Sequence, residues 1–459
     1  MTDSGKRNIF VLGLDEWNRE QLESIRGASN YRFHSLLDYD ELVNPSHYPV
    51  ARLLEKARDQ LREFPGEVNG IIGHWDFPTS TLLPFLNAEF GLHGACIAAV
   101  MRCEHKYLSR RHQQIVAPHV VPRFQVINPF QPPDWSELDL RPPFWIKPVK
   151  AFSSYLGFRI RNQRDFEHAL EANRIGIGLI GEPFNYLLGK AGLENETGIV
   201  DGFHCIAEEI ISGHQCTLEG YVHRGTPHVY GVVDSFRGPN HSSFERYEYP
   251  STLPRRVQER MIQVAGHFLE AIGYDNAPFN MEFFHDRRRD LIHLLEVNPR
   301  ISKSHCPLFQ MVTGASHHEV AVEVSQGIQP AYPQNGGGYR RAAKFMLRRY
   351  TGDATVAHAP HAEEIAEIEA LIPGVRIHLH VRPGMRLSQL PSQDQDSYSY
   401  EVAMLFVGAD SRRALFNKAA RARDLLDIRY TEADPETRPG LPLSVQTATR
   451  HHPDPSTAT

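Results

Sequence analysis

The pattern of apolar and polar positions predicts alternating strands and helices over residues 1–94. Strands are predicted at 8–14, 31–37 and 69–73, and helices at 15–26 and 50–63. This alternation is typical of a parallel sheet that helices cover on both faces. The loop after the first strand lacks a G-x-G-x-x-G sequence, so a nicotinamide dinucleotide site is not indicated. We expect an N-terminal three-layer α/β domain at 1–94.

Residues 95–432 carry a mixed pattern of helices and strands. Helices are predicted at 97–112, 164–173, 255–272, 302–313 and 411–426, and strands at 123–126, 144–148, 157–161, 205–211, 217–223, 228–234, 279–284, 291–297, 342–347, 375–380 and 401–407. The glycine-rich stretch 181–202 predicts a mobile loop. The glycine run 336–338 predicts a linker, which divides a core at 95–335 from a C-terminal lobe at 336–432. The stretch 433–459 has no periodicity and predicts a disordered tail.

Two apolar runs, 279–284 and 291–297, flank a charged turn and predict a β-hairpin. Each run contains one carboxylate, Glu282 or Glu296, and the two positions share a face of the hairpin. Their Cβ atoms would lie roughly 5 Å apart if directly opposed and about 7–8 Å apart if diagonal. Asn298 points to the same face.

Two carboxylates on one buried face repel each other and lose solvation, so a cation is needed between them. Oxygen ligands of this kind suit Mg²⁺ or Mn²⁺. The alternative is that Glu282 and Glu296 lie on an edge strand and face solvent. The sequence Asn298-Pro-Arg300 favours the metal site, because the proline ends the strand and leaves Arg300 beside the cation as an anion ligand.

The hairpin resembles a known metal-binding element. The sequences Phe-Asn-Met-Glu-Phe-Phe at 279–284 and Leu-Leu-Glu-Val-Asn-Pro-Arg-Ile at 294–301 resemble the metal hairpin of the ATP-grasp superfamily of ATP-dependent carboxylate–amine ligases. The resemblance implies an ATP-grasp fold of the α/β class, with an α+β core of two lobes and a lid at about 145–212. The segment at 336–432 resembles the small α/β lobe of biotin-carboxylase-like members.

The resemblance also implies which residues bind the ATP phosphates. Lys106 and Lys147 match the two lysines that contact them in the family. Ser153 and Ser154 lie where the family's flexible lid closes, although only one glycine, Gly157, is present in this lid. A stiffer lid is therefore expected.

A hinge between the lobes is implied at 208–215. Glu208 matches the residue that contacts the adenine amino group, and backbone groups of Glu209 and Ile211 match those that contact the adenine edge. Gln215 stands where a ribose-binding glutamate is usual, so that contact would lose its charge.

The implied chemistry is ATP-dependent activation of a carboxylate as an acyl phosphate, which an amine then attacks. Mg²⁺ would be held by Glu282, Glu296 and Asn298, and Arg300 would hold the substrate carboxylate. Two alternatives remain open: a biotin-carboxylase-like enzyme that phosphorylates bicarbonate, and an ATP-binding regulator without catalysis. The glycine-poor lid argues against the first, and the complete metal set argues against the second.

Other polar residues are expected near the reaction centre. His74, Trp75 and Asp76 follow the third predicted strand, where ligands bind in parallel sheets. Residues 302–305 follow Arg300 directly. Cys306 is expected to be a buried, unreactive thiol.

Composition restricts the partners. Net charge is −6 and there is no basic tail, which gives no support for nucleic-acid binding. No apolar run approaches the ~18 residues that would span a membrane. The five cysteines have no metal-type spacing and are expected to be reduced in a cytoplasmic protein. We expect small-molecule partners, a carboxylate and an amine, and a possible homodimer.

Overall fold

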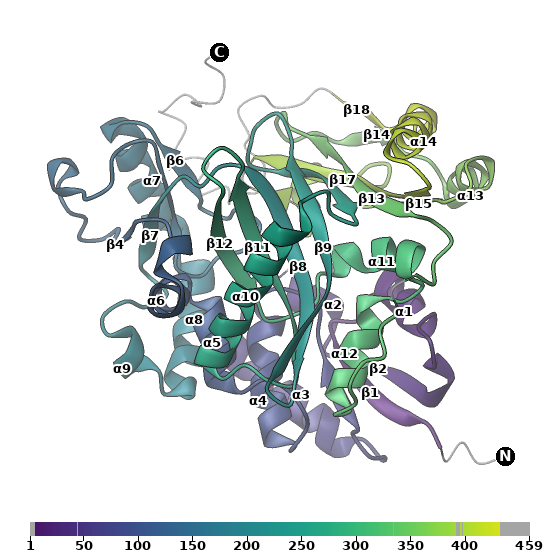
Figure 1. Cartoon of the computed structure of the whole chain (residues 1–459), viewed down its shortest axis with the longest axis horizontal. Coiled ribbons are helices and arrows are strands. Elements are labelled where there is room, and N and C mark those ends of the chain that lie inside the picture. Colours follow the sequence, from purple (N-terminus) through teal and green to yellow (C-terminus); the bar gives the residue numbers. More distant parts are fainter. Residues whose placement is uncertain (1–4, 44, 334, 392–394, 397, 432–459) are drawn as a thin grey trace.

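A computed structural model gives the structure of residues 5–43, 45–333, 335–391, 395–396 and 398–431. The predicted tail at 433–459 lies outside these residues. Figure 1 shows a central sheet, with the N-terminal sheet below it, a smaller sheet on one side and the C-terminal elements on the other. None of the helices in the described part of the chain combines the length and apolar character that crossing a membrane requires.

The N-terminal domain is a three-stranded parallel sheet covered by helices on both faces. Its strands, in spatial order, are β2 (Tyr31–Leu36), β1 (Arg7–Leu12) and β3 (Gly70–Ile72), and its helices are α1 (Glu16–Glu23), α2 (Tyr39–Val43), α3 (Val50–Glu63) and α4 (Thr79–Glu89). Phe10 and Leu12 of β1 pack toward α3, and Ile9 and Val11 pack toward α1 and the distant helix α12 (His317–Ser325). The predicted parallel three-layer arrangement is confirmed, but a helix from beyond the hairpin supplies part of one layer.

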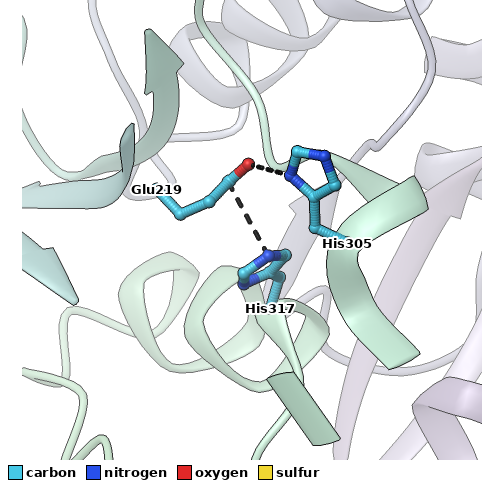
Figure 2. Close-up of side chains that lie close together, drawn as sticks. All are labelled: Glu219, His305 and His317. Atoms are coloured by element: carbon cyan, nitrogen blue, oxygen red, sulfur yellow. Dashed lines mark hydrogen bonds and ion pairs between the residues drawn. The ribbon is translucent and has the colours of Figure 1, made fainter. Parts of the chain in front are cut away.

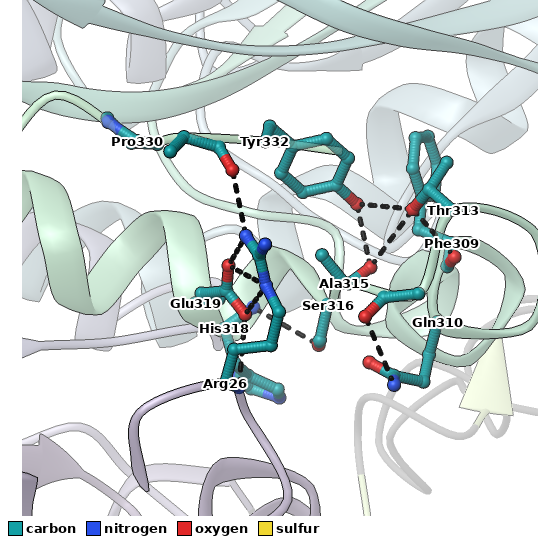
Figure 3. A network of polar contacts seen from close by, with 12 residues as sticks. Arg26, Phe309, Gln310, Thr313, Ala315, Ser316, His318, Glu319, Pro330 and Tyr332 are labelled. Atoms are coloured by element: carbon teal, nitrogen blue, oxygen red, sulfur yellow. Dashed lines mark hydrogen bonds and ion pairs between the residues drawn. The ribbon is translucent and has the colours of Figure 1, made fainter. Parts of the chain in front are cut away.

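Polar contacts also join the N-terminal domain to α12 (Figure 3). Arg26 forms an ion pair with Glu319, and its backbone N–H donates to the same carboxylate at 3.1 Å. The Arg26 guanidinium also donates to the Ala331 carbonyl at 2.8 Å. The Tyr332 hydroxyl donates to the Ala315 carbonyl at 2.8 Å. Because the Glu319 side chain is only 2% exposed, the ion pair holds the two segments together.

A smaller lobe is built on a four-stranded antiparallel sheet. Its strands, in spatial order, are β4 (Phe124–Ile127), β7 (Cys205–Glu209), β5 (Phe144–Pro148) and β6 (Phe158–Ile160), and its helices are α7 (Gln163–Gly176), α8 (Gly178–Ala191) and α9 (Glu194–Thr197). The segment between β5 and β6 contains Ser153 and Ser154, where the resemblance predicts a lid.

The prediction of a loop at 181–202 is wrong, because α8 and α9 occupy most of this segment. Phe184 and Leu187 of α8 are fully buried against the N-terminal domain. A Cβ atom at Gly181 would lie 2.3 Å from the carbonyl oxygen of Gly202. Glycine is therefore required here for a close approach of two backbones, which composition alone did not distinguish from a flexible loop.

The central sheet has nine strands. Its order is β12 (Leu291–Asn298), β11 (Ala277–Asp286), β8 (His214–His223), β9 (Thr226–Arg237), β10 (Phe244–Tyr249), β13 (Arg341–Arg349), β17 (Ser399–Ala409) and β15 (Val375–Leu379), with β16 (Gln395–Asp396) paired to β17. Four strands of the C-terminal segment, β13, β15, β16 and β17, thus extend the sheet of the core. The strands β14 (Val356–His358) and β18 (Arg429–Tyr430) make a small additional sheet.

Helices cover the central sheet. They are α5 (Ile97–Glu104), α6 (Lys106–Val116), α10 (Arg255–Ile272), α11 (Cys306–Thr313), α13 (Ala362–Leu371) and α14 (Arg412–Leu425). Met261 and Phe268 of α10 pack on Met281 and Phe283 of β11 in the main core cluster.

The predicted helix 97–112 is interrupted at His105. The backbone of His105 is extended, with φ −87° and ψ 100°, and its ring accepts a hydrogen bond from the Leu108 N–H. Lys106 therefore occupies the first position of α6, which turns its side chain toward the small lobe and the hairpin.

Candidate active site

A cleft of about 1410 Å³ lies between the small lobe and the central sheet. Its lining includes every residue to which the sequence gave a role in nucleotide, metal or substrate binding: Lys106, Lys147, Ser153, Ser154, Glu208, Glu209, Ile211, Gln215, Glu282, Glu296, Asn298 and Arg300. These residues come from segments that are up to 194 positions apart (300 − 106) in the sequence. The fold brings them all to one cavity.

The hairpin places its two carboxylates directly opposite each other. Glu282 on β11 pairs in register with Glu296 on β12, and Asn280 pairs with Asn298. A register shift, which is a β-bulge, follows Glu282. The register nearer the turn would place Glu282 opposite position 295, and the bulge places it opposite Glu296. β12 is an edge strand, but Glu296 faces the cleft, where it meets Lys106. This position in the cleft, with the side chain 31% exposed and paired with a lysine, favours the metal-site interpretation over a solvent-facing one.

The two carboxylates have very different proton affinities. Burial, followed by the charge of Glu296, raises the pKa of Glu282 to about 7. Burial alone would raise the pKa of Glu296, but Lys106 and Lys147 outweigh it and lower that pKa to about 2. Glu296 is therefore ionised at neutral pH beside Lys106, whereas Glu282 keeps its proton to a much higher pH. Two opposed carboxylates and the nearby Asn298 amide provide oxygen ligands, so the site fits Mg²⁺.

Lysines form the opposite wall of the cleft. Lys106 Nζ lies 2.7 Å from Glu296 Oε1 and donates to the Ala151 carbonyl at 2.8 Å. Lys147 Nζ lies 2.7 Å from Glu208 Oε2. Their ammonium groups thus face the metal hairpin from two different segments.

Glu208 holds two cations in the buried wall of the small lobe. Its other oxygen forms an ion pair with Arg110, which is only 2% exposed. Burial would raise the pKa of Glu208, but Arg110 and Lys147 lower it to about 2. The carboxylate therefore fixes the position of Lys147. The adenine contact assigned to Glu208 by resemblance stays a prediction.

The hinge and the lid offer backbone groups to a ligand. Within the described residues, neither the N–H nor the C=O of Ile211 makes a hydrogen bond. The Glu209 side chain instead turns to Arg123, 2.6 Å from its Nε atom. In the lid, Ser153 and Ser154 have φ of 48° and 56°, so two successive residues adopt the left-handed conformation without being glycine. Both serines line the cleft, as do Lys106 and Lys147.

Gln215 lies on β8, next to the metal hairpin. Its amide donates to Glu282 Oε2 at 2.8 Å and accepts from Arg237 Nε at 2.9 Å. These bonds orient Glu282. The ribose contact that the resemblance implies for Gln215 stays a prediction.

Arg300 connects the hairpin to the N-terminal domain. Its Nη2 atom lies 2.6 Å from Asp76 Oδ1, across 224 positions of sequence. His74 and Asp76 line the cleft, whereas Trp75 is buried, donates to the Gly13 carbonyl and stacks under Lys303. The loop after the third strand therefore does reach the candidate reaction centre, through Asp76.

Two functional contacts were missed in the sequence. Lys150, three residues after Lys147, is a further cleft lysine that forms a buried ion pair with Glu104. Arg110, the partner of Glu208, lies one helical turn after Lys106. Lys150 was visible in the sequence, but its burial was not.

Burial raises the pKa of Cys306 to about 12, in line with an unreactive thiol.

Comparisons with known proteins identify the domain and the fold. Residues 140–307 match the family model described as an ATP-grasp domain. A crystal structure of an L-amino acid ligase from Bacillus licheniformis has a TM-score of 0.68 and 16% identity, over 94% of this chain and 100% of that chain. The N5-carboxyaminoimidazole ribonucleotide synthetase from Thermotoga maritima has a TM-score of 0.58 and 14% identity, over 92% and 99%.

A third solved structure is similar over nearly the whole chain. It is the biotin carboxylase domain of the 2-oxoglutarate carboxylase from Hydrogenobacter thermophilus, in complex with MgADP and bicarbonate. Its TM-score is 0.59 and its identity 14%, over 98% of this chain and 95% of that chain. No curated protein sequence matches this chain significantly. Residues 140–307 therefore form an ATP-grasp domain, and the chain has the ATP-grasp fold that its hairpin predicts.

Proposed function

We propose that this protein is an ATP-dependent ligase that joins a carboxylate to an amine and releases ADP and phosphate. The observation that carries the proposal is the opposed pair Glu282 and Glu296, which faces Lys106 and Lys147 across one cleft. A site that only bound nucleotide would not need this complete set of oxygen ligands and cations. The similarity to an L-amino acid ligase over the full length of that chain supports an amino acid as the carboxylate.

The residues of the cleft neutralise a triphosphate from two sides. Lys106 and Lys147 donate to the phosphate oxygens, and the backbone N–H groups of Ser153 and Ser154 close over them. Glu208 keeps Lys147 extended toward the cleft. The free backbone groups of Ile211 are available to the adenine edge.

The reactive end of the cleft is the metal hairpin. Glu282, Glu296 and Asn298 would hold Mg²⁺, which would supply positive charge close to the transferred phosphoryl group. Metal binding also removes the proton that Glu282 carries below pH 7, because only the ionised carboxylate is a ligand. The protein thus supplies positioning and charge, and no covalent intermediate on a side chain is needed.

Arg300 and Asp76 lie together at the substrate end. The Arg300 guanidinium is a ligand for the substrate carboxylate and for the charge that develops when it becomes an acyl phosphate. Asp76, held against Arg300, is the carboxylate that an incoming ammonium group meets first. Both substrate groups therefore approach one ion pair from the N-terminal domain side.

The test is turnover with ATP, Mg²⁺ and pools of amino acids, followed by phosphate release and by the mass of the product. We expect phosphate release that depends on the amino acid and a product whose mass equals the two substrates less one water. Glu296→Gln should lower ADP formation by about 10²-fold or more, because the metal loses a charged ligand. Glu245→Gln, an exposed carboxylate on β10 of the same sheet, is the matched control and should keep full turnover. Unchanged turnover in Glu296→Gln would refute the metal assignment.

A further inference from the structure

A second group of metal-type ligands lies beside the cleft, and one member of the group, His305, lines it (Figure 2). It consists of Glu219 on β8, His305 before α11, and His317 at the start of α12. Glu219 Oε1 lies 2.6 Å from His305 Nδ1, and Glu219 Oε2 lies 3.8 Å from His317 Nε2. All three side chains are at most 3% exposed. The sequence gave no signal for this group, because its members come from three separate segments.

The group has polar atoms without partners. Within the described residues, Glu219 Oε2 and the Nε2 atoms of His305 and His317 accept and donate no hydrogen bond. A buried carboxylate oxygen in this state carries a large desolvation cost. Burial also lowers the pKa of His305 to about 3 and that of His317 well below its usual value, so neither ring supplies positive charge. A cation bound by Glu219 and by His317 Nε2 would remove this cost for two of the three atoms, since His305 would bind it through Nδ1, the atom that lies 2.6 Å from Glu219.

The surrounding contacts orient the histidines as ligands. The Tyr230 hydroxyl lies 2.9 Å from His317 Nδ1, which leaves His317 Nε2 directed toward Glu219. Metal-binding histidines are commonly fixed in this way through their other nitrogen. A backbone N–H from Ser302 also reaches Glu219 and orients it.

We propose that Glu219, His305 and His317 bind a transition-metal ion, most suitably Zn²⁺, at a site separate from the Mg²⁺ hairpin. Two neutral imidazoles and one carboxylate suit Zn²⁺ and related ions, whereas Mg²⁺ prefers oxygen ligands. Bond lengths of 2.0–2.1 Å place tetrahedral ligand atoms about 3.3 Å apart. The two measured separations lie on either side of that value. The ion would replace the proton between Glu219 and His305.

The site would fix the loop that carries Arg300. The ligands belong to β8, to the turn after Arg300 and to α12, so one ion would connect all three. Glu219 pairs in register with Asn280, which donates to the Arg300 carbonyl at 3.1 Å. The bound metal would therefore hold Arg300 and Lys303 in place against the sheet. This role is structural and does not require the metal to contact substrate.

Metal binding can be tested without turnover, so its outcome is independent of the proposed ligase reaction. Untagged full-length protein is stripped with a chelator, saturated with MgADP and titrated with Co²⁺ and with Zn²⁺. We expect one tightly bound equivalent, visible absorption bands of four- or five-coordinate Co²⁺, and two shifted, exchangeable imidazole N–H proton signals in the Co²⁺ form. If the wild-type protein bound no metal ion tightly, or if its Co²⁺ form showed no shifted imidazole N–H signals, the proposal would be overturned. This test needs no variant, so it does not depend on how any variant folds.

Variants locate the ion. Glu219→Gln and His317→Gln should each weaken Co²⁺ binding at least a hundredfold and remove the visible bands. His318→Gln is the matched control, because His318 is also fully buried on α12 but its Nε2 atom lies 3.2 Å from Asn18 Oδ1, outside the group. The His318→Gln variant should bind one equivalent of Co²⁺ and give the same absorption spectrum as the wild type. Equal binding by His317→Gln and the wild type would place the ion elsewhere and refute the assignment.

Discussion

The burial of Glu282, together with its repulsion by Glu296, predicts that Glu282→Gln stabilises the metal-free protein. The pKa of Glu282 is raised from 4.5 to about 7, mainly by burial and then by Glu296. At about 1.4 kcal/mol per pH unit, the ionised form of Glu282 costs the folded state about 3 kcal/mol at pH 8. Glutamine has the same shape and can still accept from Gln215, so it removes the charge and keeps the contact.

The sign of the pH dependence follows from the raised pKa. Between pH 4.5 and 7 the folded state binds more protons than the unfolded state, so the stability of the wild type falls as pH rises through this range. We therefore expect Glu282→Gln to gain about 2–3 kcal/mol of unfolding free energy at pH 8 and little at pH 4.5. When Mg²⁺ and ADP are added at pH 8, the wild type should become more stable than Glu282→Gln, because only the wild type gains the binding energy of the ligand.

The assay is urea unfolding in a chelating buffer at pH 4.5 and at pH 8, followed by tryptophan fluorescence and circular dichroism. Glu245→Gln, the exposed control on β10, should change stability by less than about 0.5 kcal/mol at both pH values. The reasoning is refuted if Glu282→Gln gives no gain at pH 8, or if the same gain appears at pH 4.5.

Two further predictions concern buried contacts of the small lobe. Glu208→Gln should destabilise the protein by about 3 kcal/mol at pH 7, because Arg110 and Lys147 lose their shared counter-charge, and the difference should vanish as pH falls toward 2, the lowered pKa of Glu208. A loss below about 1 kcal/mol in urea unfolding at pH 7 would contradict it. Gly181→Ala should cost about 1–3 kcal/mol, because its Cβ would lie 2.3 Å from a backbone oxygen, whereas Gly178→Ala in the same helix meets its nearest atom at 3.8 Å and should cost nothing. Equal stabilities of the two alanine variants would show that the backbone relaxes around residue 181.

Local sequence determined the elements that carry the chemistry. The two apolar runs and their charged turn specified the hairpin, and the period of two put Glu282, Glu296 and Asn298 on one face. The order of the motifs around it was enough to predict the ATP-grasp fold, which the comparisons confirm. These features were predictable because neighbouring residues along one or two strands determine them.

Local sequence was misleading where packing decided the structure. The glycines of 181–202 indicated a flexible loop, but two of them, Gly181 and Gly202, lack Cβ atoms where α8 and the backbone at Gly202 approach closely. His105 interrupts a helix that the apolar pattern predicted as continuous. At Gly181 the deciding neighbour, Gly202, lies outside the window from which periodicity is measured, and at His105 a local contact to the Leu108 N–H starts a new helix.

Only the tertiary structure decided which distant charges meet. Arg300 pairs with Asp76, Glu208 with Arg110, and Glu219 with His305, and each pair joins segments that are more than 80 positions apart. No periodicity within one segment specifies such a partner, because the burial that forces buried charges to pair arises only when the sheets and helices pack together. The sequence by itself therefore determined the hairpin with its opposed carboxylates and the fold, whereas packing determined the charge balance of the site and assembled the cluster of Glu219 and the two histidines.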